Sequence, residues 1–141
     1  MKFLFPVDGS ECSLSALDRF IDILPALDGK PDITLIYVHP QLPYPRAVAW
    51  AGAEVVKKYY DEESDTALAK AQKRMELTGL PFKVEKRIGD PAHEIVKFAE
   101  KETCAIIAMG THGRSALSNL LMGSVATKVL AAGKVPVLFL K

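Results

Sequence analysis

The sequence predicts a single α/β domain built on a five-stranded parallel sheet, doubly wound, with helices on both faces. Three observations predict this fold. Short apolar runs alternate with helix-like segments along the whole chain. Several of those runs are almost continuously apolar, as strands buried on both faces are. The 141 residues, 49% of them hydrophobic, suffice for one domain with a real core.

The first half of the chain predicts two strands, with a helix between them and a loop after them. Lys2–Val7 and Ile33–Val38 are apolar runs bounded by turn residues, as buried strands are. Between them, Glu11–Leu24 carries apolar residues at helical spacing on one face, and Ser10 is a suitable N-cap. His39–Trp50 contains three prolines, so we expect a stiff and irregular connection there.

The second half predicts three further helices and three further strands. Ala51–Thr78 is a strongly charged helix that ends before Gly79, and the alternating segment Phe82–Ile88 is an outer strand. Pro91 begins the next helix, with Asp90 as its N-cap. The remaining elements are a buried strand at Cys104–Met109, a helix at Ser124–Ala132 and a closing strand at Val135–Leu140.

Composition and charge exclude several classes of function. A net charge of +1, with both signs mixed along the chain, attracts neither nucleic acid nor an anionic membrane. No apolar run approaches the roughly 18 residues of a membrane span, and the apolar stretch near Met1 is shorter than the about 7–15 residues of a secretory signal. Two cysteines are too few for a disulfide scaffold. We therefore expect a cytoplasmic domain with no nucleic-acid or membrane partner.

The pattern that carries chemistry is a glycine-rich stretch between the fourth strand and the last helix. Gly110 and Gly113 follow the strand, and Gly123-Ser124 opens the helix after nine intervening residues. Glycine permits positive φ and a close approach of a ligand to the backbone. The first N–H groups of a helix lack intrahelical partners and carry partial positive charge, which suits phosphate. Ligands of open parallel sheets bind beyond the carboxyl ends of the strands, where Asp8 also lies.

The spacing of these glycines matches neither the P-loop, which needs Gly-x4-Gly-Lys-Ser/Thr, nor the dinucleotide fingerprint. A helix terminus contributes at most ~2 kcal/mol, whereas micromolar affinity needs about 8 kcal/mol. Base and ribose contacts must therefore contribute most of the binding. The residues alone leave two interpretations open, namely nucleotide binding, or glycines that serve only as turn and cap residues.

Several segments together resemble one known family. The most specific are Gly110-Thr111-His112-Gly113-Arg114 and, after nine residues, Gly123-Ser124-Val125-Ala126. Further matches are Pro6-Val7-Asp8-Gly9-Ser10, Gly89-Asp90-Pro91-Ala92 and Val135-Pro136-Val137-Leu138. Over its whole length, residues 1–141, the chain closely resembles the ATP-binding branch of the universal stress protein family. The resemblance implies a Rossmann-like fold, similar to adenine nucleotide alpha hydrolases, with strand order 3-2-1-4-5.

The resemblance also implies a nucleotide site where the strand order reverses, with Asp8 opposite Gly110. Asp8 would contact the ribose or base, and Val38 would meet adenine through its backbone. The implied binding residues are Pro6, Val7, Asp8, Val38, Met109, Gly110, Gly113, Arg114, Gly123, Ser124 and Val125. The implied ligand is ATP, or ADP or AMP, with Mg²⁺.

A regulatory stress-response protein is the function that the resemblance implies, rather than a fast enzyme. Hydrolysis would be slow, because no general base or arginine finger for the γ-phosphate is evident. The apolar strand at 135–140 lies at a sheet edge in the implied order, and an uncovered edge invites pairing with another chain. Since members of the family often dimerise through this strand, we expect a homodimer.

Other classes of function stand as alternatives. A true ATPase or phosphotransferase would use Asp8, His112 and Ser124, and a nucleotide-free dimeric interaction module would use none of them. A phosphorelay receiver would need clustered acids after the first strand, where Asp8 stands alone. A flavin-binding flavodoxin would need a hydroxyl-rich phosphate loop at the same place.

Individual polar residues have plain interpretations. His112, a lone histidine in a glycine turn, is more often a surface residue than a catalytic base. Arg114 is equally well a phosphate contact or a solvated turn residue. We expect Cys12 and Cys104 to be small core residues. The spacing of the histidines and cysteines predicts no metal site, and we assign no catalytic residue.

Overall fold

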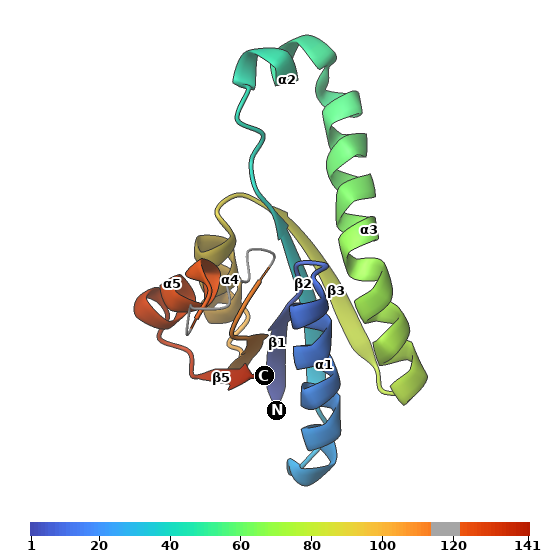
Figure 1. Ribbon diagram of the computed structural model, residues 1–141, viewed down its shortest axis with the longest axis vertical. Helices are drawn as coiled ribbons and strands as arrows, with labels where there is room; N and C mark the ends of the chain where they lie inside the picture. The colour runs from blue at the N-terminus through green and yellow to red at the C-terminus, as the bar shows by residue number, and fades with distance from the viewer. Residues whose placement is uncertain (114–121) are drawn as a thin grey trace.

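The computed structural model describes residues 1–113 and 122–141, and its centre is a five-stranded parallel sheet (Figure 1). The strand order is β3-β2-β1-β4-β5, which confirms the predicted order and the parallel pairing. The strands are β1 (Lys2–Pro6), β2 (Asp32–His39), β3 (Phe82–Ile88), β4 (Ile106–Gly110) and β5 (Val137–Leu140).

Helices cover both faces of this sheet, as predicted. One face carries α1 and α3, and the other carries α4 and α5 (Figure 1). The helices are α1 (Glu11–Ile23, followed by a 3₁₀ turn at Leu24–Ala26), α2 (Pro45–Ala51), α3 (Ala53–Thr78), α4 (Pro91–Lys101) and α5 (Ser124–Ala132). No helix in residues 1–113 and 122–141 has the length and apolarity that crossing a membrane requires.

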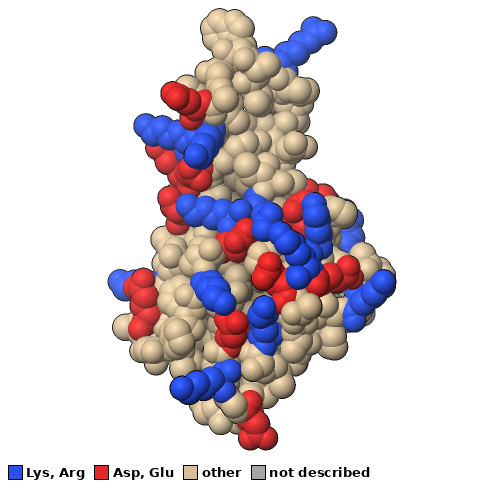
Figure 2. Space-filling model, turned by 180° about the vertical axis from the view of Figure 1, so that it is seen from behind, with Lys and Arg blue, Asp and Glu red and all other residues tan. Residues whose placement is uncertain are grey.

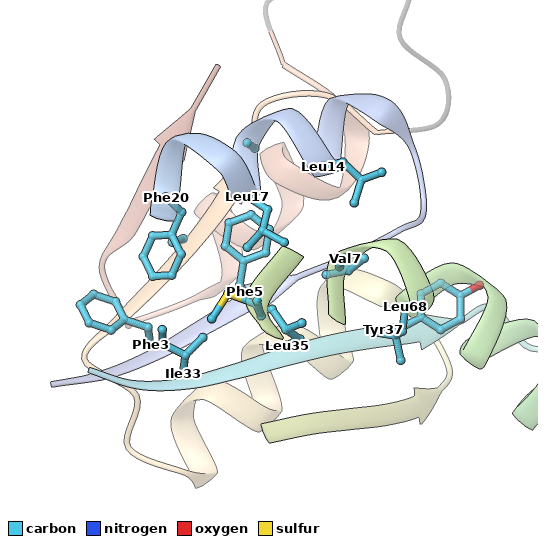
Figure 3. Close-up of a cluster of buried hydrophobic side chains, with 14 of the residues drawn as sticks. Phe3, Phe5, Val7, Leu14, Leu17, Phe20, Ile33, Leu35, Tyr37 and Leu68 are labelled. Carbon is cyan, nitrogen blue, oxygen red and sulfur yellow. The ribbon is translucent and has the colours of Figure 1, made fainter. Parts of the chain in front are cut away.

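Alternate side chains of the strands feed two separate cores, because successive residues of a strand point to opposite faces. Phe3 and Phe5 of β1 pack beneath α1, where the Phe20 ring lies 5.3 Å from Phe3 and 5.5 Å from Phe5 (Figure 3). Leu4, between them, joins the other core with Ile95 of α4. The central strand is thus fixed from both sides, and its carboxyl end is held at a defined place.

The segment between β2 and α3 differs from the prediction of an irregular connection. Pro45–Ala51 forms the helix α2, with Pro45 in its first turn. Proline is well suited to that position, because its missing N–H would have no intrahelical acceptor and its φ is already helical. Gly52, with φ of 92°, then separates α2 from α3, so the long helix begins at Ala53 rather than Ala51.

The ends of several strands also differ from the prediction by one or two residues. β4 begins at Ile106 rather than Cys104, and β5 begins at Val137 rather than Val135. Proline has no N–H to donate, so Pro136 contributes only its carbonyl oxygen, which accepts from the Ile107 N–H at 2.9 Å.

Candidate functional site

A cavity of about 230 Å³ lies beyond the carboxyl ends of β1 and β4. β1 is hydrogen-bonded to β2 on one side and to β4 on the other, so the strand order reverses at this point. Open α/β sheets bind ligands in the crevice that such a reversal creates. The position of the cavity therefore follows from the topology of the sheet.

Ten of the eleven residues that the sequence predicted for a site line this one cavity. They are Pro6, Val7, Asp8, Val38, Met109, Gly110, Gly113, Gly123, Ser124 and Val125. The eleventh, Arg114, lies outside the described residues. His112, which the sequence offered only for the alternative of a true ATPase or phosphotransferase, also lines the cavity. The lining residues that were not assigned to a site from the sequence are Ser13, Ile36, Tyr37, Pro40, Pro91, Ile95, Thr111 and Ala126. Most of them are the chain neighbours of predicted residues, or lie on the inward faces of α1 and α4.

Much of the described cavity lining is apolar. Its walls include Val7 from the turn after β1, Ile36 and Val38 from β2, and Met109 from β4, and each of these side chains is buried. Ile95 adds a buried contribution from α4. A flat apolar group such as a nucleobase can displace water from walls of this kind, which is the favourable term in most small-molecule sites.

Asp8 provides a carboxylate at the floor of the cavity and is held in place by its own turn. Its Oδ1 accepts a hydrogen bond from the Ser10 N–H at 2.8 Å. Its Oδ2 lies only 2.7 Å from where a Cβ on Gly113 would be placed. Extending the β1–β4 register, in which Leu4 is opposite Ile107, sets Gly110 opposite Val7. The expectation that Asp8 lies opposite Gly110 is therefore wrong by one residue, because Val7 takes that place and the Asp8 carboxylate lies beside Gly113.

The prediction that Gly110 and Gly113 adopt positive φ is wrong, since neither is among the residues with positive φ. Both glycines are explained instead by close contacts within the chain. A Cβ on Gly110 would lie 3.2 Å from the Cβ of Ala16 in α1, and a Cβ on Gly113 would meet Asp8. These contacts let α1 and the turn after β4 approach one another, which gives the cavity its shape.

The N-terminus of α5 opens into the cavity without a side-chain cap. Its N-cap residue is Gly123, whose N–H donates to the Thr111 carbonyl at 2.6 Å. The first turn of the helix closes with the Thr127 N–H donating to the Gly123 carbonyl at 3.0 Å. No side chain among residues 1–113 and 122–141 caps the N–H groups of the residues between, Ser124 to Ala126, and these residues line the cavity. Such N–H groups form an anion-binding end of a helix.

The described lining of the cavity contains no lysine or arginine. It holds one carboxylate, Asp8, and one imidazole, His112, whose Nδ1 lies 2.9 Å from Thr111 Oγ1. Residues 1–113 and 122–141 contain no group of three or more His, Cys, Asp and Glu side chains that would hold a metal ion. An anionic ligand would therefore rely on the helix end and on any cation that it brings with it.

Ser13, in the first turn of α1, is a lining residue that the sequence did not predict. Its side chain is only 5% exposed, and its Oγ has no hydrogen-bond partner in the part of the chain that the structure describes. Leaving a buried hydroxyl unpaired costs about 1–3 kcal/mol. The signal that could have found it is its position three residues after the N-cap Ser10, which orients it toward the sheet.

The two cysteines lie apart from the cavity lining and differ from each other. Cys12 is exposed, so its prediction as a core residue is wrong, whereas Cys104 is buried as predicted. Cys12 occupies the outer face of the first turn of α1, a face that the helical spacing of its apolar neighbours leaves to solvent. Burial raises the pKa of the Cys104 thiol and keeps it neutral.

Comparison with known proteins identifies strong similarity at the level of both sequence and structure. The family model described as the universal stress protein family matches residues 1–141. Universal stress protein MJ0531 of Methanocaldococcus jannaschii is 37% identical over 140 residues, which cover 99% of this chain and 81% of that protein. The structure of hypothetical protein MJ0577 from the same organism aligns with a TM-score of 0.84 at 30% identity, covering 99% of this chain and 94% of that one.

Two more distant solved structures contain nucleotides. The universal stress protein from Archaeoglobus fulgidus in complex with dAMP aligns with a TM-score of 0.67 at 21% identity, over 100% of this chain and 98% of that one. A universal stress protein in complex with cAMP aligns with a TM-score of 0.66 at 22% identity, over 100% and 96%. At this level of identity the two structures establish the shared fold.

Proposed function

The chain belongs to the universal stress protein family, and from that premise we propose that it binds an adenine nucleotide in the cavity beyond β1 and β4. One observation carries the proposal. The cavity lining combines buried apolar side chains, suited to a base, with the N-terminus of α5, which no described side chain caps and which suits phosphate. In this binding mode the base contacts the apolar side chains and the phosphates contact the N–H groups at the start of α5.

The sequence-predicted residues divide between the two ends of such a ligand. Pro6, Val7, Val38 and Met109 line the side proposed for the base. Asp8 is placed to accept hydrogen bonds from ribose hydroxyls, since an ionised carboxylate only accepts. The phosphates are assigned to the glycine stretch and the start of α5. That set is Gly110, Gly113, Gly123, Ser124 and Val125, together with Arg114, which lies outside the described residues.

The oxygen atoms that line the cavity suit a nucleotide with its cation. Ser13 Oγ is a buried hydroxyl in need of a partner, and the ribose offers hydroxyls and a ring oxygen. Mg²⁺ prefers oxygen ligands and is usually bound through one or two protein oxygens together with substrate phosphates. Asp8 and the Ser124 hydroxyl are oxygen donors of this kind. When bound, the cation supplies positive charge that the described lining lacks.

ATP is the proposed ligand, and ADP and AMP are its alternatives. The related proteins in complex with dAMP and cAMP support an adenine nucleoside monophosphate as the part that the fold recognises. The three N–H groups at the start of α5 can serve more than one phosphate, which favours the longer nucleotide. The dAMP complex belongs to a protein only 21% identical to this one, so it supports the ligand class rather than its phosphate number.

We assign the site to binding rather than to rapid turnover. Fast phosphoryl transfer needs a cation aimed at the γ-phosphate and a group that orients the nucleophile. The described lining holds no lysine or arginine, and His112 is already within hydrogen-bond distance of Thr111. The protein would then act as a cytoplasmic regulatory factor in a stress response, whose state depends on the bound nucleotide, with at most slow hydrolysis.

Homodimerisation through strand 135–140 completes the proposal. β5 forms one edge of the sheet. The Pro136 carbonyl points toward β4, and the backbone groups of successive strand residues point to alternate sides. The N–H and C=O groups of Val137 and Phe139 therefore point to the free edge. Such a row of unpaired groups is a template for another strand. A mass of two chains in light scattering at micromolar concentration is expected, and the mass of one chain would contradict this pairing.

The ligand itself is tested by releasing and identifying whatever the purified protein carries. The protein is purified without added nucleotide, denatured, and the released fraction is chromatographed against ATP, ADP and AMP standards. We expect an adenine nucleotide in amounts comparable with the protein. Protein stripped of ligand should then melt at least about 5 °C higher in Mg-ATP at 100 times Kd, since that occupancy contributes about 2.7 kcal/mol.

Mg-GTP is the control that tests whether the site recognises adenine. Mg-GTP at the same concentration should raise the melting temperature less than Mg-ATP, because the purine edge differs while the phosphates do not. A protein that releases no nucleotide and whose melting temperature stays unchanged in millimolar Mg-ATP would show that the glycine stretch is only structural.

A further inference from the structure

An apolar arm projects from the end of the molecule at which β2 finishes (Figure 1). We define the arm as residues 41–59, which comprise α2, its preceding loop and the first two turns of α3. None of its residues is buried, and the first buried residue of α3 is Tyr60. The arm therefore contributes nothing to either core, although most of its side chains are apolar.

Large apolar side chains of the arm are strongly exposed. Trp50 is 92% exposed, Tyr44 70%, Val55 60% and Tyr59 40%. In α2 only Arg46 is polar. Figure 2 shows the contrast from behind, since charged side chains crowd the body of the molecule while the projecting end is largely tan. Contiguous exposed apolar surface of this kind marks an interaction site, whereas single exposed apolar residues do not.

The base of the arm is fixed to the body. The Leu42 N–H donates to the Tyr60 hydroxyl oxygen at 3.0 Å. The His39 ring at the end of β2 lies 5.0 Å from the Tyr60 ring and 5.7 Å from the Tyr59 ring. The apolar side chains of the arm are thus presented on an anchored helical hairpin, which lowers the entropy lost when a partner covers them.

We propose that the arm is an interface between two copies of this chain, in which two arms pack side by side in antiparallel orientation. The exposed area is adequate for such a contact. An aromatic side chain buries ~150–250 Å², so the exposed fractions of Tyr44, Trp50 and Tyr59 leave roughly 400 Å² per arm. Two arms with their valines and alanines then reach the about 1,000 Å² that a specific interface requires.

The charges next to the apolar patch favour a second copy over a membrane surface. The arm carries Lys57 and Lys58, but Asp61, Glu62 and Glu63 follow on the next turn of α3, and an anionic lipid surface would repel them. Antiparallel packing sets the base of each arm, with Lys57 and Lys58, beside the tip of the other, where Glu54 follows the junction of α2 and α3. The intrahelical pair between Lys58 and Glu62, 3.8 Å long, leaves both side chains more than 60% exposed and available.

This interface is distinct from the β5 edge. The arm continues into α3, which packs on β2 and β3, whereas β5 is the opposite edge of the sheet. Both contacts can therefore form at once, and arm pairing would join dimers into tetramers or longer assemblies. Pairing of the arms does not require a bound nucleotide, because no residue of the arm lines the cavity.

Light scattering on two matched variants of the full-length chain tests the arm. Val55→Asp places a charge in the proposed interface at a position already 60% exposed, so folding should be unaffected. Leu77→Asp is the control, because Leu77 is 81% exposed near the other end of the same helix. We expect the mass of Val55→Asp to be half that of the wild type or less, and Leu77→Asp to match the wild type. Equal masses for all three proteins would overturn the proposal.

Trp50 is the only tryptophan of the chain and reports directly on the same contact. Its emission should shift to shorter wavelength as wild-type or Leu77→Asp protein is concentrated, and should return on dilution, while Val55→Asp stays red-shifted throughout. An emission maximum that never leaves the value of an exposed indole refutes pairing of the arms. A shift that appears only with phosphatidylcholine–phosphatidylglycerol vesicles, and not with protein concentration, would assign the arm to lipid instead.

Discussion

The N-termini of α4 and α5 lie on the same face of the sheet and border the same cavity, yet they are built differently. At α4 the Asp90 Oδ2 accepts the His93 N–H at 3.0 Å, and Pro91, at the start of the helix, has no N–H at all. At α5 the N-cap is Gly123, and no side chain in the part of the chain that the structure describes caps the first turn. One helix satisfies its terminal donors within the chain, and the other leaves them facing the cavity.

This difference is the one expected if the proposed ligand binds at the start of α5 and not at the start of α4. A side-chain cap typically contributes ~1 kcal/mol to stability, and α1 gains such a cap when Ser10 Oγ accepts the Ser13 N–H at 3.1 Å. α5 forgoes that contribution. An uncapped helix end of this kind costs stability in the free protein, and a bound phosphate is the group that restores the missing hydrogen bonds.

The largest loss of nucleotide affinity is expected when α5 is given an aspartate N-cap like that of α4. Gly123→Asp should be accommodated, because φ is −71° and an added Cβ would meet nothing closer than 3.4 Å. Its carboxylate would occupy the N–H groups of the first turn and repel phosphate. We expect nucleotide affinity to fall about 100-fold, or about 2.7 kcal/mol, measured by titration calorimetry with Mg-ATP.

Gly123→Asn separates the charge from the cap. Asparagine has the shape of aspartate and caps helices comparably well, but it adds no negative charge. Its affinity loss should be about 10-fold, or about 1.4 kcal/mol. Equal losses for the two variants would mean that the cap, and not charge repulsion, displaces the nucleotide. If neither variant loses affinity, the phosphates do not bind at α5.

A smaller effect, a loss of stability, is expected where Gly113 packs against the Asp8 carboxylate. Gly113→Ala would bring a methyl group to 2.7 Å from Asp8 Oδ2, so the carboxylate must move. Overpacking of this kind typically costs about 1–3 kcal/mol, and thermal unfolding of the nucleotide-free protein would measure it. In an Asp8→Ala background the same substitution should cost clearly less. An equal cost in both backgrounds would show that Asp8 is not what the glycine accommodates.

The architecture was predictable from the sequence because its local signals agree with the tertiary structure. Ser10 and Asp90 are both found as N-caps, as predicted, and their side chains accept hydrogen bonds from the N–H groups of Ser13 and His93. The almost continuous apolarity of β2 correctly indicated burial on both faces. The grouping of the predicted site residues around one cavity followed from the strand order, which the family resemblance implied and the structure confirmed.

Features that depend on contacts between distant segments were not predictable in the same way. The three prolines of the arm indicated a loop, whereas Pro45 begins a helix, because proline breaks a helix only after its first turn. The glycines after β4 suggested positive φ, whereas their lack of a Cβ is required by Ala16 and Asp8. Ser13 was not predicted, because its only signal was its position three residues after the N-cap Ser10, and its place in the cavity depends on how α1 packs beside β4.

The smallest expected effect comes from removing the cap of α4, and it tests whether the two helix ends really differ in role. Asp90→Ala should lower stability by ~1 kcal/mol, which shifts the melting temperature by roughly 2–4 °C in a domain of about this size. Nucleotide affinity should stay within about twofold of the wild type, because Asp90 does not line the cavity and its hydrogen bond serves only α4. A variant that keeps its stability but loses affinity would reverse the assignment, since α4 would then be the helix end that holds the ligand.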